Sequence, residues 1–211
     1  MNVLVIGAHP DDETIGVGGT IIKHLQNGDK VHIILFSVGH KPIQPKLKEQ
    51  AYEALKVFGI NKNNLNWLNC KSGQFELDSK LKVNSKLAKL VSKIKPKIVY
   101  TTPSNDISKD HLTIHECTLV ATRPHTNNVK QVLSYEVPGP VKTTFTPNVY
   151  ENISKEFPYK INAFKKYKSE IEKFPHYRSI EALEMLSKKR GIEAGFSKAE
   201  AFQLISWYRD D

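Results

Sequence analysis

The chain has 211 residues, 39% of them hydrophobic and 25% charged, a composition that suits one globular domain with a real core. Lys and Arg number 31 against 22 Asp and Glu, which gives a formal net charge of +9. The lysines alternate with apolar residues at helical spacing, which favours solvated helix faces over a surface dedicated to nucleic acid or membrane. No apolar run approaches the ~20 residues that span a bilayer, and the N-terminus lacks the basic segment of a signal peptide. We therefore expect a cytoplasmic protein without a membrane span, in which Cys70 and Cys117 are free thiols.

Apolar, strand-like runs alternate with amphipathic stretches from the N-terminus to residue 137. Strands are expected at 3–6, 31–36, 64–69, 97–102 and 131–137, and helices at 14–26, 46–60, 79–94 and 111–121. This alternation predicts an α/β fold, with a Rossmann-like, mostly parallel sheet that is flanked by helices and connected by right-handed crossovers.

The chain after residue 137 has a different pattern. Residues 138–152 are rich in Pro and Thr and predict an extended excursion, and three helices are expected after it, at 155–173, 180–189 and 198–207. Ser179 can cap the second of these helices, and Ser197 with Glu200 has the spacing of a capping box for the third. We therefore expect one domain over residues 1–211, with a Rossmann-like core at 1–137 and an extended excursion and helical tail at 138–211.

Acidic and histidine residues gather where two of the predicted strands end. His9, Asp11 and Asp12 follow the first strand, and His111 follows the fourth. Ligands of open parallel sheets bind beyond the carboxyl ends of the strands, so these two loops should meet. Two histidines and an aspartate are a common ligand set for catalytic zinc, which keeps one position open for water. A further carboxylate could act as the base for that water.

Two plainer interpretations of this region compete with a metal site. A histidine beside an aspartate is often only a surface pair. The run GVGG at residues 16–19 could suggest a dinucleotide loop, but it lacks the spacing G-x-G-x-x-G. It also follows three acids, which would repel a pyrophosphate.

The segments AHPDDE at 8–13 and GVGGTI at 16–21, followed by Asn-Asp at 105–106 and Asp-His at 110–111, resemble the PIG-L/LmbE family of zinc-dependent N-deacetylases. The later segments TRP, SYEVP, PHYRS and RGIEAGFSKAEAF are similar to a bacterial branch of that family associated with sugar and glycan biosynthesis. The resemblance implies a Rossmann-like fold that holds Zn²⁺, or another divalent metal, at the carboxyl edge of the sheet.

The family pattern also implies roles for individual residues. It makes His9, Asp12 and His111 the metal ligands and Asp11 the general base. Asp110 is expected to orient a neighbouring group as a hydrogen-bond acceptor. Glu13 would favour the N-terminus of the next helix, where negative charge is stabilised.

The second motif departs from the family pattern at Ser108, where many members carry a histidine that helps to stabilise the oxyanion. A serine hydroxyl is a weak replacement, so we expect His176, in PHYRS, to serve as the second catalytic group beside Asp11. His115 shares a helix face with His111 but is not part of the family signature. Ser108, Arg123 and Arg178 are candidate contacts for anionic or hydroxyl-rich substrate groups.

These observations predict a zinc-dependent hydrolase that removes an N-acetyl group from an amino sugar of the N-acetylglucosamine type, or from its conjugate. The expected partner is a small or conjugated amino-sugar substrate and not a nucleic acid, and a homo-oligomer is compatible with the sequence. One alternative is a zinc amidase acting on another acyl-amine glycoconjugate. The other is a basic Rossmann-like module that binds nucleic acid or an anionic surface and has a vestigial metal site, motivated by the net charge of +9.

Overall fold

The computed structural model of the chain describes residues 1–39, 44–77 and 80–209. These residues form a seven-stranded sheet with the strand order β3-β2-β1-β4-β5-β7-β6. The strands are β1 (Asn2–Gly7), β2 (Lys30–Leu35), β3 (Leu65–Trp67), β4 (Ile98–Thr101), β5 (Gln131–Tyr135), β6 (Val149–Asn152) and β7 (Ala199–Trp207). The helices are α1 (Asp12–Gln26), α2 (Gln44–Phe58), α3 (Lys80–Ile94), α4 (Lys109–Ala121), α5 (Phe157–Phe164) and α6 (Ile180–Ala194). The predicted α/β fold is confirmed, while the start predicted for α3 at residue 79 lies outside the described residues.

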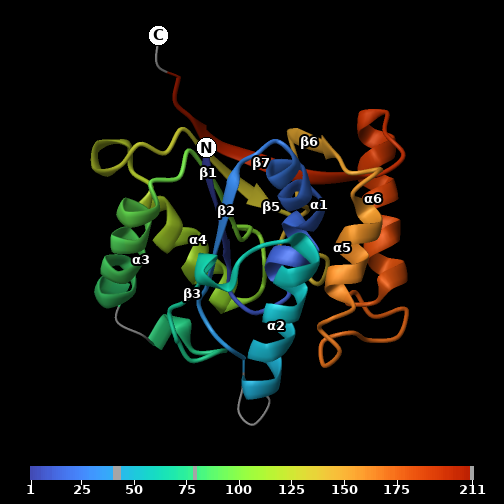
Figure 1. Cartoon of the computed structure of the whole chain (residues 1–211), viewed down its shortest axis with the longest axis horizontal. Coiled ribbons are helices and arrows are strands. Elements are labelled where there is room, and N and C mark those ends of the chain that lie inside the picture. Colours follow the sequence, from blue (N-terminus) through green and yellow to red (C-terminus); the bar gives the residue numbers. More distant parts are fainter. Residues whose placement is uncertain (40–43, 78–79, 210–211) are drawn as a thin grey trace.

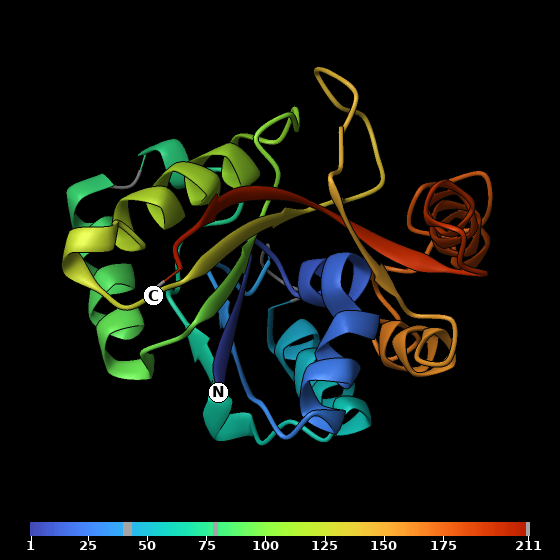
Figure 2. The same cartoon turned by 90° about the horizontal axis from the view of Figure 1, so that it is seen from above.

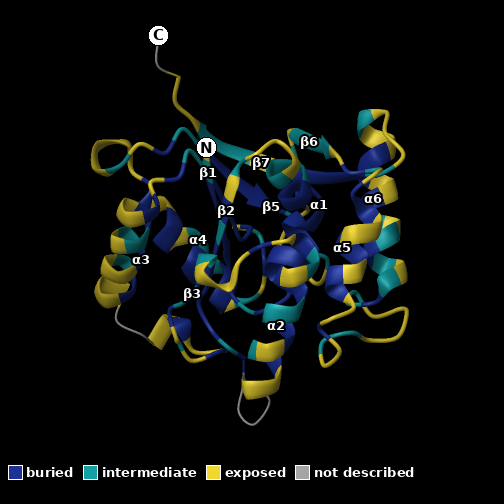
Figure 3. Cartoon of the chain, in the orientation of Figure 1, coloured by how far each residue is buried: buried dark blue, intermediate teal, exposed yellow. Residues whose placement is uncertain are grey.

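Helices cover both faces of the sheet (Figures 1 and 2). Helices α3 and α4 lie on one face, and α1, α2 and α5 lie on the other. Successive residues of β1 alternate between the two cores: Val3 and Val5 belong to one cluster, and Leu4 and Ile6 to the other. A strand buried on both sides must be apolar throughout, which explains the unbroken run at the start of the sequence. The central strands are accordingly buried along their length (Figure 3).

The order in which successive strands are added to the sheet reverses at β1. Strand β2 pairs with β1 on one side and β4 pairs with it on the other, both in parallel. The chain therefore leaves the carboxyl ends of β1 and β4 toward opposite faces, which opens a crevice between the two following loops. Those loops carry the acids and histidines that the sequence analysis singled out.

The last of the three predicted tail helices is wrong, because residues 199–207 form strand β7. This strand lies between β5 and β6 and pairs antiparallel with both, so its backbone hydrogen bonds are made across the sheet. The expected capping box is wrong as well. The Glu200 carboxylate instead accepts hydrogen bonds from the backbone amides of Gly19 and Thr20, at 2.9 and 2.8 Å.

The rest of the tail agrees with the sequence only in part. Ser179 caps α6 as predicted, with its hydroxyl accepting a hydrogen bond from the Ala182 amide at 3.0 Å. The predicted helix at 155–173 ends at Phe164, and turns follow it. The excursion at 138–152 contains β6 near its end. The tail therefore adds two strands to the sheet as well as helices.

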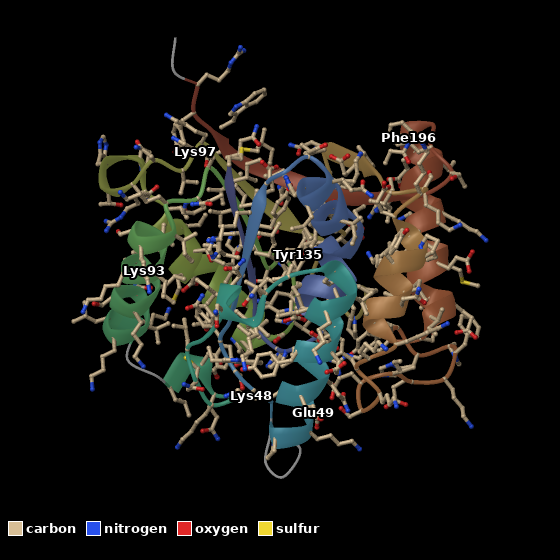
Figure 4. The ribbon with its side chains drawn as sticks, in the orientation of Figure 1. Lys48, Glu49, Lys93, Lys97, Tyr135 and Phe196 are labelled. Atoms are coloured by element: carbon tan, nitrogen blue, oxygen red, sulfur yellow. The ribbon has the colours of Figure 1, made fainter. Side chains whose placement is uncertain are left out.

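Close packing explains the glycines of α1. A Cβ atom on Gly16 would lie 2.3 Å from the Tyr135 ring, and one on Gly19 would lie 2.5 Å from Ile153. Figure 4 shows Tyr135 in the middle of the molecule. The run GVGG thus lets the sheet and the tail approach the helix closely.

Candidate active site

Asp12 is fixed by the turn that joins β1 to α1. Its Oδ2 atom accepts hydrogen bonds from the backbone amides of Ala8, at 2.9 Å, and His9, at 2.8 Å. Burial opposes ionisation of Asp12, but attraction to His111 and then to His9 outweighs it, and the pKa of this carboxyl is held well below its ordinary value. Asp12 is therefore a buried, ionised carboxylate with a fixed direction.

His9, Asp12 and His111 offer three donor atoms that lie within 4.8 Å of one another, the one such group found among the described residues. His9 Nδ1 is 3.9 Å from Asp12 Oδ2, and His111 Nε2 is 3.5 Å from the same oxygen. Two imidazole nitrogens and a carboxylate oxygen are the donor types that zinc takes in proteins. The group therefore fits a zinc ion.

The second nitrogen of each histidine meets another carboxylate. His9 Nε2 lies 2.9 Å from Asp110 Oδ2, and His111 Nδ1 lies 2.6 Å from Asp106 Oδ2. Such outer carboxylates fix the tautomer and orientation of metal-binding histidines. Asp110 was expected to be an orienting group, whereas no role was predicted for Asp106. The Asn-Asp pair at 105–106 includes this acid, five residues before His111, and was the feature of the sequence that could have identified it.

Electrostatics favour positive charge at this point. Burial disfavours the charged form of His111, but attraction to Asp12 and the hydrogen bond to Asp106 outweigh it and raise its pKa to about 10. Burial likewise opposes ionisation of Asp110, and the hydrogen bonds from His9 and from two backbone amides still leave its pKa lowered. A pocket that stabilises a proton between carboxylates also suits a metal cation.

Asp11 is buried in an unusual state. Its side chain is fully inaccessible, and both carboxylate oxygens lack a hydrogen-bond partner. Burial raises its pKa well above the ordinary value, and the nearby Arg178 guanidinium offsets part of that rise. Its φ of 121° is rare for a residue with a side chain. Strained backbone and a buried acid with a perturbed pKa are features that gather at functional sites.

The segment between α5 and α6 lies against the site. Arg178 Nε is 3.6 Å from Asp11 Oδ2, and Arg178 also donates a hydrogen bond to Glu170 at 2.8 Å. His176 is exposed, its Nδ1 accepts a hydrogen bond from the Arg178 amide at 3.1 Å, and its ring stacks on Tyr177. The structure thus brings the PHYRS segment to the site, with Arg178 as the residue that meets Asp11.

Two clefts meet at the candidate metal-ligand group, which consists of His9, Asp12 and His111. Both clefts are bordered by His9, Ser108 and Arg178. One has a volume of about 410 Å³, and its lining includes the charged side chains of Lys109, Asp110 and Glu170. The other, of about 360 Å³, contains Asp12 and His111. The apolar and aromatic residues that line it are Ile15, Ile107, Val137, Pro138, Pro140 and Tyr177. A substrate whose reacting bond lies at the ligand group would therefore have a cleft on either side, one lined by more charged side chains and the other by more apolar ones.

Of two other residues predicted to contact the substrate, Ser108 lies at the site and Arg123 does not. Ser108 borders both clefts and caps α4, with its hydroxyl accepting a hydrogen bond from the His111 amide at 3.4 Å. Arg123 follows the far end of α4, about 18 Å along the helix axis from His111 at ~1.5 Å per residue, and its Nε donates to the Val120 carbonyl. The structure does not bring Arg123 to the site, because α4 runs away from the carboxyl edge of the sheet.

Similar proteins were found at the levels of family, sequence and structure. Residues 4–122 match the family PIG-L, described as GlcNAc-PI de-N-acetylase. The "uncharacterized deacetylase YaiS" of Escherichia coli is 30% identical over 179 residues, which cover 79% of this chain and 90% of that protein.

Solved structures share the fold at lower identity. The N,N'-diacetylchitobiose deacetylase of Pyrococcus horikoshii is 20% identical with a TM-score of 0.81, covering 97% of this chain and 84% of that one. GalB, a 4-carboxy-2-hydroxymuconate hydratase from Pseudomonas putida, is 17% identical with a TM-score of 0.79, covering 100% and 98%. The fold therefore carries more than one kind of reaction, and the structural likeness by itself does not choose between them.

The sequence matches make that choice. The family match spans residues 4–122 and so includes both loops of the site, and the Escherichia coli relative is alike over most of both chains. Both bear the name of a deacetylase, which agrees with the enzyme class predicted from the sequence. The chain belongs to the PIG-L family of de-N-acetylases.

Proposed function

We propose that the protein is a zinc-dependent hydrolase that removes the N-acetyl group from an N-acetylated amino sugar, or from a conjugate of one. The observation that carries this proposal is the group of His9, Asp12 and His111 beside the buried Asp11 carboxylate, whose oxygens make no hydrogen bond. The family description and the name of the Pyrococcus relative support an acetylated amino sugar as the substrate class.

His9 Nδ1, Asp12 Oδ2 and His111 Nε2 would hold the zinc ion, because their other polar contacts leave these atoms facing one another. Zinc bound there would polarise the amide carbonyl and lower the pKa of a water molecule. Asp106 and Asp110 keep each imidazole in the tautomer that presents a free nitrogen to the ion.

Asp11 is proposed as the general base. As water attacks the amide carbonyl carbon, the Asp11 carboxylate accepts a proton from it. The carbon–nitrogen bond then breaks as Asp11 returns its proton to the leaving amine, and acetate and the free amino sugar leave. Asp11 suits this role because its oxygens make no hydrogen bond that the incoming proton would have to displace.

The developing negative charge on the carbonyl oxygen calls for a donor besides the metal. We propose that His176 and Arg178 supply the hydrogen-bond donors of this edge, His176 for the reacting atoms and Arg178 for the substrate's polar groups. Arg178 borders both clefts. The His176 ring stacks on Tyr177, which lines the cleft that contains Asp12 and His111. Ser108, also at the border of both clefts, is proposed as a further substrate contact.

A free-amine assay of the zinc-loaded protein tests the proposal. The panel comprises N-acetylglucosamine as the free sugar and in nucleotide-linked, lipid-linked and inositol-linked forms. We expect amine release from at least one, abolished by a chelator and restored by zinc. A second panel carries other acyl groups on the same amine, and amine release confined to that panel would favour the alternative, an amidase for another acyl-amine glycoconjugate.

Metal content provides the second arm of the test. Zinc analysis of the protein should show binding that is lost in Asp12→Asn and in His111→Ala, since each removes one of three ligands. Full zinc occupancy in either variant would show that the ligands are assigned wrongly. A protein that takes up no divalent metal under any loading condition would overturn the proposal.

A further inference from the structure

A buried cluster next to the metal-ligand group has no role in the chemistry described above. Glu13 Oε1 accepts hydrogen bonds from the Tyr167 hydroxyl and the Thr14 hydroxyl, each at 2.6 Å. Glu13 Oε2 accepts a hydrogen bond from the Asp11 backbone amide at 3.2 Å. Glu13, Thr14 and Tyr167 are all buried. Both oxygens of the Glu13 carboxylate are thus used to connect the tail of the chain to the backbone of Asp11.

This connection acts where the backbone is strained. Asp11 has a φ of 121°, a conformation that persists in a side-chain-bearing residue only when the surroundings enforce it. Its amide is held by Glu13, and its carbonyl accepts hydrogen bonds from the amides of Thr14, at 3.0 Å, and Ile15, at 2.8 Å. Both polar groups of the Asp11 backbone are therefore fixed, while its side-chain oxygens make no hydrogen bond.

The first turn of α1 shows why this arrangement is not ordinary helix capping. Asp11 stands at the N-cap position, but its side chain makes no capping hydrogen bond. The usual N-cap aspartate would bend its carboxylate back to a helix amide. The Glu13 carboxylate accepts the hydrogen bond of the Asp11 amide instead, and the Asp11 carboxylate faces the Arg178 guanidinium, with Nε 3.6 Å from Oδ2.

We propose that Tyr167 and Glu13 are positioning residues, which hold the Asp11 backbone so that its carboxylate stays free of hydrogen bonds beside the metal-ligand group. Tyr167 steadies the Glu13 carboxylate, and Glu13 fixes the Asp11 amide. The role as a catalytic aid rests on the proposed function, because it assumes that Asp11 is the base. The role in fixing the Asp11 backbone does not depend on that assumption.

The first test compares Tyr167→Phe with Tyr100→Phe in the zinc-loaded protein. Each substitution removes one hydroxyl from a buried tyrosine. The Tyr100 hydroxyl lies 3.0 Å from His24 Nε2, and neither Tyr100 nor His24 lines either cleft. Displacement of a catalytic group by about 1 Å costs on the order of 100-fold in rate. We expect kcat to fall roughly 10- to 100-fold in Tyr167→Phe with KM and zinc content unchanged, and no such fall in Tyr100→Phe. Equal kcat values for Tyr167→Phe and the wild type would overturn the catalytic part of the proposal.

The second test uses Glu13→Gln and reads the backbone directly. A glutamine keeps one oxygen for Tyr167 and Thr14 but turns an NH₂ group toward the Asp11 amide, so two donors face each other. We expect amide hydrogen exchange of Asp11, followed by NMR in the zinc-loaded protein, to become faster in Glu13→Gln and unaltered in Tyr100→Phe. Unchanged exchange in Glu13→Gln would overturn the backbone part.

A third variant keeps both parts testable should Tyr167→Phe fail to fold. Thr14→Val removes the other hydroxyl from Glu13 Oε1 and keeps the Tyr167 hydroxyl, and it should speed Asp11 amide exchange and lower kcat. Should the wild type release no amine from any substrate, the proposed function fails, while the exchange measurements still decide whether Glu13 holds the Asp11 backbone.

Discussion

Asp11 combines three properties that are each uncommon for an aspartate: a positive φ, complete burial and two carboxylate oxygens without a hydrogen bond. Backbone strain of this kind costs about 1–3 kcal/mol. A buried polar group without a hydrogen bond adds a further cost of about 1–3 kcal/mol. A fold retains such a residue at the expense of stability. The neighbouring Asp12 shows the contrast, since its Oδ2 accepts hydrogen bonds from two backbone amides and lies near both histidines.

Asp11→Asn should separate these costs from function. The amide keeps the size of the carboxylate and loses its basicity, so we expect a fall in kcat of about 10²–10⁴-fold with zinc content unchanged. Stability to denaturant should stay the same or rise, because a neutral side chain is easier to bury. Steady-state kinetics together with metal analysis measure this. Wild-type turnover in Asp11→Asn would place the base elsewhere.

His176→Ala tests the second catalytic group expected from the sequence. Loss of one donor to an oxyanion costs roughly 10²–10³-fold in rate, so kcat should fall by that amount while zinc binding is retained. His125→Ala is the matched control, since His125 also lies exposed in a short turn but follows the distant end of α4. A normal kcat in His176→Ala would transfer the donor role to Arg178, which stands 3.6 Å from Asp11.

Residues close together in one motif could be read from the sequence, whereas pairings across the chain could not. The segment AHPDDE indicated His9, Asp11 and Asp12 directly. Tyr167 carries no such signal, because its role depends on a hydrogen bond to a residue 154 positions earlier. Arg123 was expected at the site from its motif alone, and the direction of α4 takes it away from there.

At the level of elements, β7 shows how tertiary pairing overrides a local pattern. Ser197 and Glu200 have the spacing of a capping box, and the alanines around them are good helix formers. In the fold, two strands with free edges are available on either side of this segment, and pairing with both of them decides its structure. Strands β1 to β5 were predictable, because their apolar runs lie between amphipathic helices and follow one another in regular alternation.

Gly16→Ala tests the close approach of α1 to the sheet. The new Cβ atom would lie 2.3 Å from the Tyr135 ring, and overpacking of this kind typically costs about 1–3 kcal/mol. Gly18→Ala is the control, because its nearest contact is the Lys160 side chain at 3.0 Å. Urea denaturation should show a lower free energy of unfolding for Gly16→Ala and a smaller change for Gly18→Ala. Equal values for the two variants would show that Tyr135 can move aside.

The molecule as a whole depends on its tail for more than covering the sheet. Lys160 and Glu200 form a buried ion pair at 2.6 Å, and Glu200 also binds the amides of Gly19 and Thr20 in α1. Removing one member of a buried pair typically costs 3–5 kcal/mol. Two elements far apart in the sequence, α5 and β7, are thereby joined to the helix that begins at the metal-ligand group. Among the described residues, no helix is long and apolar enough to cross a membrane.

The net charge of +9 leads to a prediction for the whole molecule. Lys93 and Lys97 lie at the periphery of the molecule (Figure 4), and neither borders the clefts at the metal-ligand group. A scattered charge of this kind gives weak attraction to nucleic acid that falls steeply with salt. We expect no retention of a DNA or RNA duplex at about 0.15 M salt, near physiological ionic strength, in a filter-binding or anisotropy assay. Tight binding that persists there would revive the nucleic-acid alternative.

The positions of the proposed metal ligands along the chain have a consequence for biosynthesis. Because a ribosome makes the protein from its N-terminus, His9, Asp12 and His111 all leave the exit tunnel before Tyr167 and Arg178 have been joined to the chain. The groups that can capture a metal ion are therefore complete earlier than the groups that hold and neighbour Asp11. A nascent polypeptide therefore acquires the residues proposed to bind the ion before it acquires those proposed to use it.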